Sequence, residues 1–323
     1  MNIIIKYDEW KKMLACAACT AAFLGMLLLP QGCLVKEEAG GGMMVAADIV
    51  PLAEFCRVVG GDRVRVETLV PPGASPHTYE LTGGQMRFLS QADLLVTVGL
   101  GLIPWAEEVL AKVDNPDLLN VVAGEAVPRS ELIPAGEEER RDAEEVEGEY
   151  QAYNPHIWLD PDLCVYIVEA ILEGFTAADP GNAYYYEENA RTYIEELRVL
   201  RSDIEAEVAA FAERKFVSFH SSWDYFARRF GLEQVGVIEE LPGKEPSARD
   251  IADLIDLMAA LKVKAIFAEP QFDPRAAEAI AEESGGDVEV VTLDPLGDPG
   301  EPGRSTYIDL MRDNVANMGE VLR

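Results

Sequence analysis

The chain of 323 residues contains only three histidines, and each lies in a loop or at the end of a strand-like run. His77 follows the run RVRVETLV in PPGASPHTYE, His156 lies in NPHIWLDP, and His220 ends KFVSFH. Loops after parallel strands face one crevice, where Asp294 of VEVVTLDPLG would join them. Neutral imidazoles and a carboxylate are a ligand set for zinc. Each histidine alone is more simply a cap or hydrogen-bonding group, but their joint placement favours a metal site.

The elements that must position these residues alternate between short apolar runs and helical patterns. This alternation predicts an α/β fold in which a parallel sheet is flanked by helices, and it occurs twice. The predicted strands are 43–50, 63–70 and 93–99 in the first unit, and 215–220, 233–238, 263–269 and 288–294 in the second. The predicted helices are 82–92, 105–113, 247–261 and 274–284, with another beginning near Pro161.

Residues 182–214 form one helical pattern without proline or glycine. At about 1.5 Å per residue such a helix would span ~50 Å, which predicts a stiff connection between the two units. An ordinary packed helix interrupted by a turn is the alternative. We therefore expect two lobes, each with a mainly parallel sheet flanked by helices, joined by a long rigid backbone helix. The expected boundaries are 43–180, 181–214 and 215–323.

The N-terminus has the pattern of an export signal, with three lysines followed by the apolar run 13–29. Cys33 after Gly32 resembles a bacterial lipobox, although Pro30 stands where leucine is usual. We expect a lipoprotein-type signal peptide over 1–32 and a flexible tether over 33–42. A plain secretory signal and an uncleaved anchor are the alternatives.

The other two cysteines outside this region, Cys56 and Cys164, fit either one disulfide or two buried thiols.

The charge is strongly negative, with 58 acidic and 27 basic residues and a formal net charge of -31. It disfavours nucleic acid and anionic lipid as partners and attracts cations without selecting among them. Taken alone, the charge is better explained by solubility or adaptation to salt. The acidic stretch 136–149 lacks histidine and is typical of a solvated surface loop.

Five stretches in order resemble the metal-specific solute-binding proteins of bacterial ABC importers, the zinc and manganese family of ZnuA-like and TroA-like proteins. They are PPGASPHTYELTGGQMRFLSQADLLVTVG, NPHIWLDP, FVSFHSSWDYFARRFGL, PSARDIADLIDLMAALKVKAIFAEPQFDP and VTLDPLG. The resemblance runs from Val45 to the C-terminus. It implies two α/β lobes joined by a long helix, with a metal ion held between them.

The same resemblance implies roles for particular residues. His77 and His156 of the first lobe and His220 of the second are implied metal ligands, with Asp294 as the fourth. Glu269 in AEPQFDP lines the same cleft and is expected to orient a histidine or add charge; the alternative is a carboxylate that caps the following helix. Manganese importers of this family often have Glu where this chain has His220, which favours zinc, but the histidine-rich loop of many zinc members is missing.

What the resemblance implies is an exported protein at the periplasm or the outer face of the cytoplasmic membrane. It would be tethered through Cys33 and monomeric, would bind no nucleic acid, and would deliver zinc to an ABC permease and its ATPase. Manganese or iron is the alternative cargo. A metal-dependent hydrolase and a surface adhesin are the rival classes, but the chain has no H-E-x-x-H or P-loop motif. Metal binding should weaken as the pH falls through the histidine range near ~6.5.

Overall fold

The computed structural model describes residues 42–103, 105–136, 153–240, 242–285 and 287–323. The expected signal peptide, the lipid-anchor cysteine, nearly all of the tether and most of the acidic stretch lie outside these residues. Among the helices that are described, none combines the length and the apolar character that a membrane span requires.

The first sheet has four parallel strands in the order β2-β1-β3-β4. The strands are β1 (Met43–Ala47), β2 (Val64–Thr68), β3 (Leu94–Thr97) and β4 (Leu119–Val122). One face packs on α2 (Val50–Gly60) and α6 (Pro161–Ala178), and the other on α3 (Gly83–Leu89) and α4 (Ala106–Lys112). We call this sheet with its helices the first lobe.

Two features of the first lobe were not expected from the sequence. The strand expected over 43–50 ends at Ala47, because Pro51 stands in the first turn of α2 and starts a helix within the same apolar run. Strand β4 was not predicted. It is a short edge strand whose first two residues are exposed, so its sequence lacks the apolar run of a buried strand.

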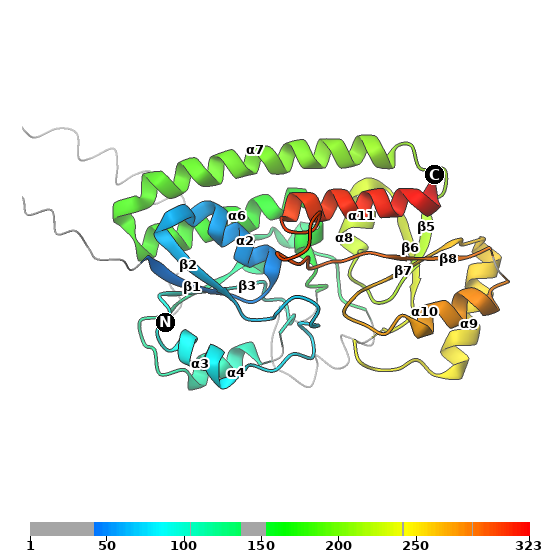
Figure 1. Cartoon of the computed structure of the whole chain (residues 1–323), viewed down its shortest axis with the longest axis horizontal. Helices are drawn as coiled ribbons and strands as arrows, with labels where there is room; N and C mark the ends of the chain where they lie inside the picture. The colour runs from blue at the N-terminus through cyan, green and yellow to red at the C-terminus, as the bar shows by residue number, and fades with distance from the viewer. Residues whose placement is uncertain (1–41, 104, 137–152, 241, 286) are drawn as a thin grey trace, which may run out of the picture. The chain divides into compact units, whose positions relative to one another are not determined.

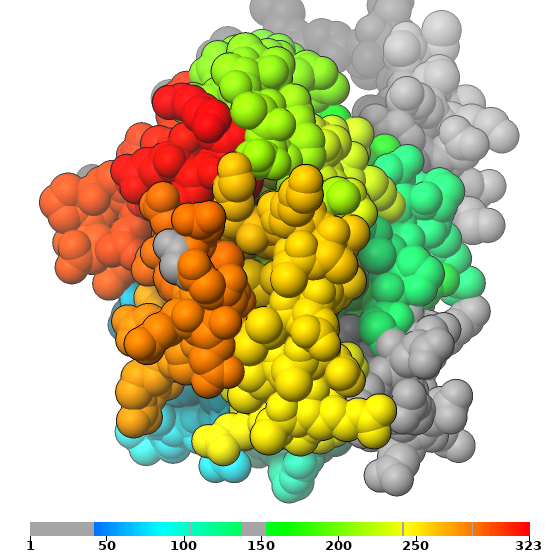
Figure 2. All heavy atoms as spheres, turned by 90° about the vertical axis from the view of Figure 1, so that its right-hand side faces the viewer, coloured from blue at the N-terminus to red at the C-terminus, as the bar shows by residue number. Residues whose placement is uncertain are grey.

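The second sheet also has four parallel strands, in the order β6-β5-β7-β8. They are β5 (Lys215–Ser218), β6 (Glu233–Val237), β7 (Ala265–Ala268) and β8 (Glu289–Thr292), and all four were predicted. One face packs on α8 (Asp224–Phe230) and α11 (Tyr307–Leu322), and the other on α9 (Ala248–Leu261) and α10 (Arg275–Glu283). We call this part the second lobe. Figure 2 shows α9 and α10, in yellow and orange, on its outer side.

The long helix is α7 (Ala183–Val208), which contacts α2 and α6 of the first lobe and α8 and α11 of the second (Figure 1). It has 26 residues and ends six residues earlier than predicted. The chain turns away because Phe211 is buried and the Ala212 and Glu213 amides donate to the Leu322 carbonyl at the end of α11. At about 1.5 Å per residue its length is roughly 39 Å.

One continuous apolar core crosses the boundary between the lobes. It joins Phe55 of α2 and Leu197 of α7 to Phe216 of β5 and Met318 of α11. Cys56 and Cys164 are buried in this core as free thiols, so of the two alternatives they are not joined by a disulfide. A shared, close-packed core resists independent movement of the two sheets.

Candidate metal centre

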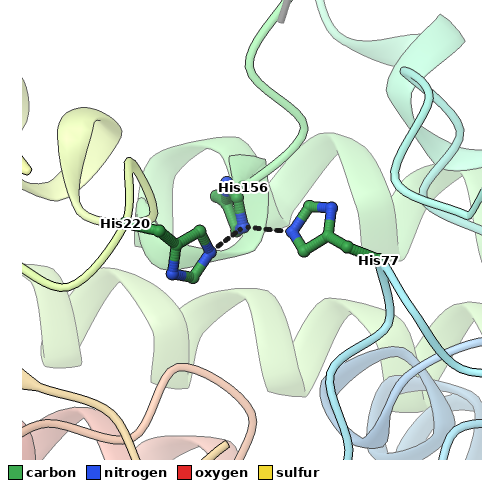
Figure 3. Close-up of side chains that lie close together, drawn as sticks. All are labelled: His77, His156 and His220. Carbon is green, nitrogen blue, oxygen red and sulfur yellow. Dashed lines mark hydrogen bonds between the residues drawn. The ribbon is translucent and has the colours of Figure 1, made fainter. Parts of the chain in front are cut away.

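His77 lies in the loop that follows β2 and points toward the second lobe (Figure 3). The loop is fixed to the start of α4, because the indole Nε1–H of Trp105 donates to the Tyr79 carbonyl at 2.6 Å. The imidazole of His77 is only partly buried, unlike those of the other two histidines.

His156 lies immediately before the short 3-10 turn Ile157–Leu159 that leads into α6, and it is 2% exposed. Its backbone N–H donates to Asn154 Oδ1 at 2.9 Å, and its ring Nδ1 lies 2.9 Å from the same oxygen. The ring also packs against Trp158, with 5.1 Å between the centroids. The orientation of His156 is therefore fixed by two neighbouring residues.

His220 follows β5, and the neighbouring strand β7 places Glu269 beside it. The ring Nδ1 of His220 lies 2.7 Å from Glu269 Oε1, which also accepts from the Ser222 hydroxyl at 3.1 Å. Because a carboxylate accepts hydrogen bonds, this contact places the proton on Nδ1 and leaves Nε2 as the free nitrogen. Glu269 thus contacts the histidine that it was expected to orient.

The three Nε2 atoms converge (Figure 3). The Nε2 atom of His156 lies 3.3 Å from that of His77 and 3.1 Å from that of His220. One ligand atom from each histidine lies within 4.8 Å of the other two, and among the described residues no other group of His, Cys, Asp or Glu meets this criterion. Tetrahedral zinc with nitrogen at about 2.0–2.1 Å separates its ligands by about 3.3 Å, so this spacing fits one ion. The adjoining cavity of about 10 Å³ has room for one water-sized occupant.

Asp294 lies beside this group but is not part of it. Its Oδ1 accepts from the Gln271 amide at 3.1 Å and from the Leu296 N–H at 3.0 Å, and its Oδ2 lies 3.4 Å from the Arg304 guanidinium. Pro295 and Leu296 line the cavity. As a ligand, Asp294 would bring to the ion a carboxylate that is already bonded to Gln271 and paired with Arg304.

A family model described as zinc-uptake complex component A, periplasmic (ZnuA), matches residues 45–321. The chain belongs to the ZnuA family. It is 28% identical to the zinc-binding lipoprotein AdcA of Streptococcus pneumoniae over 88% of this chain, which spans only 56% of that relative. It is 29% identical to the manganese-binding lipoprotein MntA of Bacillus subtilis over 89% of this chain and 92% of that protein. A crystal structure of ZnuA matches with a TM-score of 0.75 and 30% identity, covering 88% of this chain and all of that one.

The two-lobe α/β fold expected from the sequence is confirmed in this member of the ZnuA family.

Burial and the neighbouring imidazoles determine the protonation of the histidine group. Desolvation, with a smaller contribution from His220, lowers the pKa of His77 to about 3. Desolvation, followed by contributions from His220 and then His77, lowers the pKa of His156 well below its usual value. Both rings are therefore uncharged at neutral pH, as metal binding requires.

Several residues around the group were not singled out by the sequence prediction. Asn154 contacts His156, and Gln271 holds Asp294. The carboxamide oxygen of Gln271 and Oε2 of Glu269 are buried without a hydrogen-bond partner. The signal that could have found Asn154 is its place two residues before His156, because an amide at that spacing can turn back onto the ring.

Proposed function

We propose that this chain is the extracytoplasmic solute-binding component of an ABC importer, which captures zinc(II) between its lobes and delivers it to a membrane permease and its ATPase. The observation that carries the proposal is the convergence of three imidazole Nε2 atoms, with those of His77 and His220 at zinc-ligand spacing from that of His156. Membership of a family of metal-binding transport proteins supports it. We further propose that the chain acts as a monomer, exported and lipid-anchored at Cys33.

In this proposal the first lobe (43–180) supplies His77 and His156, and the second (215–323) supplies His220, with 181–214 as the connection. Glu269 holds the His220 ring, and Asp294 is the fourth ligand. Three nitrogen ligands favour zinc over manganese, which prefers more oxygen. Manganese remains the second candidate, since one close relative is named as manganese-binding.

The cargo is tested by elemental analysis of protein purified without added metal, followed by calorimetric competition among zinc, manganese and iron. We expect co-purified zinc and a preference for zinc in competition. Co-purified manganese that zinc fails to displace would overturn the choice of cargo but not the site.

The pH dependence of zinc binding should be weak. Between about pH 7.5 and 5.5, three imidazoles with an ordinary pKa near 6.5 would lower the affinity roughly a thousandfold. Because His77 has a pKa of about 3 and His156 a lowered pKa, neither takes up a proton in this range. We therefore expect a much smaller fall in affinity over this range, in the direction expected from the sequence. Competition with a chelator across this range measures it, and a thousandfold fall would contradict the proposed protonation states.

Replacing Asp294 tests the fourth ligand. The Asp294→Asn variant should bind zinc about tenfold more weakly and should lose more of its affinity for manganese, because a carboxylate contributes relatively more where oxygen ligands are preferred. Asp298→Asn is the matched control. Asp298 lies on the same loop, and its carboxylate accepts a hydrogen bond from the Gly300 N–H. Equal affinities of the two variants for both metals would remove Asp294 from the ligand set.

A further inference from the structure

Asn154 connects the two halves of the histidine group and is 2% exposed. It precedes His156 in the first lobe, yet its side chain reaches the loop after His220 in the second. Its backbone N–H donates to the Ile133 carbonyl at 2.8 Å, and its backbone carbonyl accepts from the Tyr225 hydroxyl at 2.8 Å. The residue is thus held from both lobes before its side chain is considered.

The orientation of the Asn154 carboxamide is fixed by two backbone groups. The backbone N–H of His156 can only donate, so the atom 2.9 Å from it is the oxygen. The carbonyl of Ser221 can only accept, so the atom 2.6 Å from it is the nitrogen. With the carboxamide flipped, its NH2 group would face the His156 N–H and its oxygen would face the Ser221 carbonyl, so neither hydrogen bond could form.

This orientation determines the tautomer of His156. The Asn154 oxygen lies 2.9 Å from Nδ1 of the ring and can only accept, so Nδ1 carries the proton. Nε2 is then the nitrogen with a free lone pair. It is the atom that lies nearest to Nε2 of His77 and His220, so Asn154 presents the correct nitrogen to the site.

The nitrogen of the same carboxamide holds the second lobe. It donates to the Ser221 carbonyl at 2.6 Å and to Asp224 Oδ2 at 2.9 Å. Ser221 directly follows His220, and Asp224 begins α8. The other oxygen of Asp224 accepts from Gln234 of β6 at 2.8 Å, so the carboxylate is itself anchored to the second sheet. One buried amide therefore sets the spacing between the segments that carry His156 and His220.

We propose that Asn154 is a positioning residue for metal capture: its oxygen selects the His156 tautomer, and its nitrogen fixes the distance between the two lobes at the site. This inference rests on the proposed function. A release step that separates His156 from His220 would have to break the two bonds from the Asn154 nitrogen. Residues of this kind typically change metal affinity by about 10- to 100-fold.

Three variants separate the two roles. Asn154→Ala removes both, so we expect about 10- to 100-fold weaker zinc binding and faster release. Asn154→Asp keeps an oxygen for His156 but loses both donor bonds and places a carboxylate against Asp224, so the tautomer should persist while release accelerates. Adding Asp224→Asn to Asn154→Asp supplies a new donor between these side chains and should slow release again. Asn115→Asp is the matched control, because Asn115 donates to the Leu89 and Ala92 carbonyls within the first lobe.

The tautomer is read in the metal-free protein by nitrogen NMR of the imidazoles, which a chain with three histidines makes simple to assign. We expect a protonated Nδ1 on His156 in the wild type and in Asn154→Asp, and an altered signal in Asn154→Ala. An unchanged His156 signal and an unchanged zinc release rate in Asn154→Ala would overturn the inference. If Asn154→Ala fails to fold, the inference is overturned when adding Asp224→Asn to Asn154→Asp does not slow zinc release. A wild-type protein that binds no zinc while showing the Nδ1-protonated tautomer would refute the proposed function alone.

Discussion

Replacement of His156 by alanine is expected to lower the zinc affinity by about a hundred- to a thousandfold. Four-ligand structural zinc sites are worth about 10–16 kcal/mol, or roughly 3–4 kcal/mol per ligand, and each 1.4 kcal/mol is tenfold. His156 should show the full effect because it is buried and its Nε2 atom lies closest to both other imidazoles, at 3.1 and 3.3 Å. Calorimetry with a competing chelator measures the change.

The control for this experiment is Tyr184→Ala, which truncates an aromatic side chain of α7 that is 75% exposed and does not line the cavity. It should leave the affinity close to that of the wild type. His77→Ala and His220→Ala should resemble His156→Ala. Unaltered zinc affinity in all three alanine variants would show that the metal binds elsewhere.

Removal of Arg229 is expected to destabilise the protein by about 2–4 kcal/mol. Arg229 of α8 donates through Nε to both oxygens of Asp160, at 3.0 and 2.9 Å. Asp160 is fully buried and also accepts from the Asp162 N–H, where it caps α6. In Arg229→Met the buried carboxylate of Asp160 would lose its neighbouring cation. This destabilisation is smaller than that expected for a fully buried ion pair, because the Arg229 side chain is 25% exposed and water screens its charge.

The loss of stability in Arg229→Met should be larger at higher pH. Burial raises the pKa of Asp160 to about 6, and the Arg229 charge opposes the rise. The folded pKa thus lies above the unfolded value near ~3.9, so Asp160 favours folding at low pH and this contribution is lost as the pH rises through 6. Without Arg229 the folded pKa rises further, and the variant should be affected more at about pH 8 than at about pH 5.

Urea unfolding at both pH values measures the free energy of unfolding for this comparison. Asp160→Asn combined with Arg229→Met should recover much of the loss, because the buried charge is gone. Arg191→Met is the control, since the ion pair of Arg191 with Glu188 is solvent-exposed and should contribute little. A pH-independent loss in Arg229→Met would mean that packing, and not the buried charge, accounts for the effect.

The sequence alone determined which residue types were available and which elements would carry them. The four strands of the second sheet are apolar runs bounded by turns and helical patterns, so their periodicity was sufficient to find them. The exposed edge strand β4 and the helix α2 were missed or misplaced, because neither shows a local pattern that separates it from its surroundings. The early end of α7 also escaped prediction, since it depends on contacts of Phe211 and Glu213 with distant parts of the chain.

The placement of His77, His156 and His220 after strands or before a helix was readable from the sequence, because the order of elements in a parallel α/β fold sends such loops to one edge. Only the tertiary structure decided that their Nε2 atoms lie 3.1 and 3.3 Å apart, that Asn154 joins the two lobes, and that Asp294 is held by Gln271 and Arg304. These distances depend on how the lobes are set against each other. That setting depends on packing in a core shared between residues far apart in the chain and on cross-lobe bonds such as those of Asn154, neither of which a local pattern encodes.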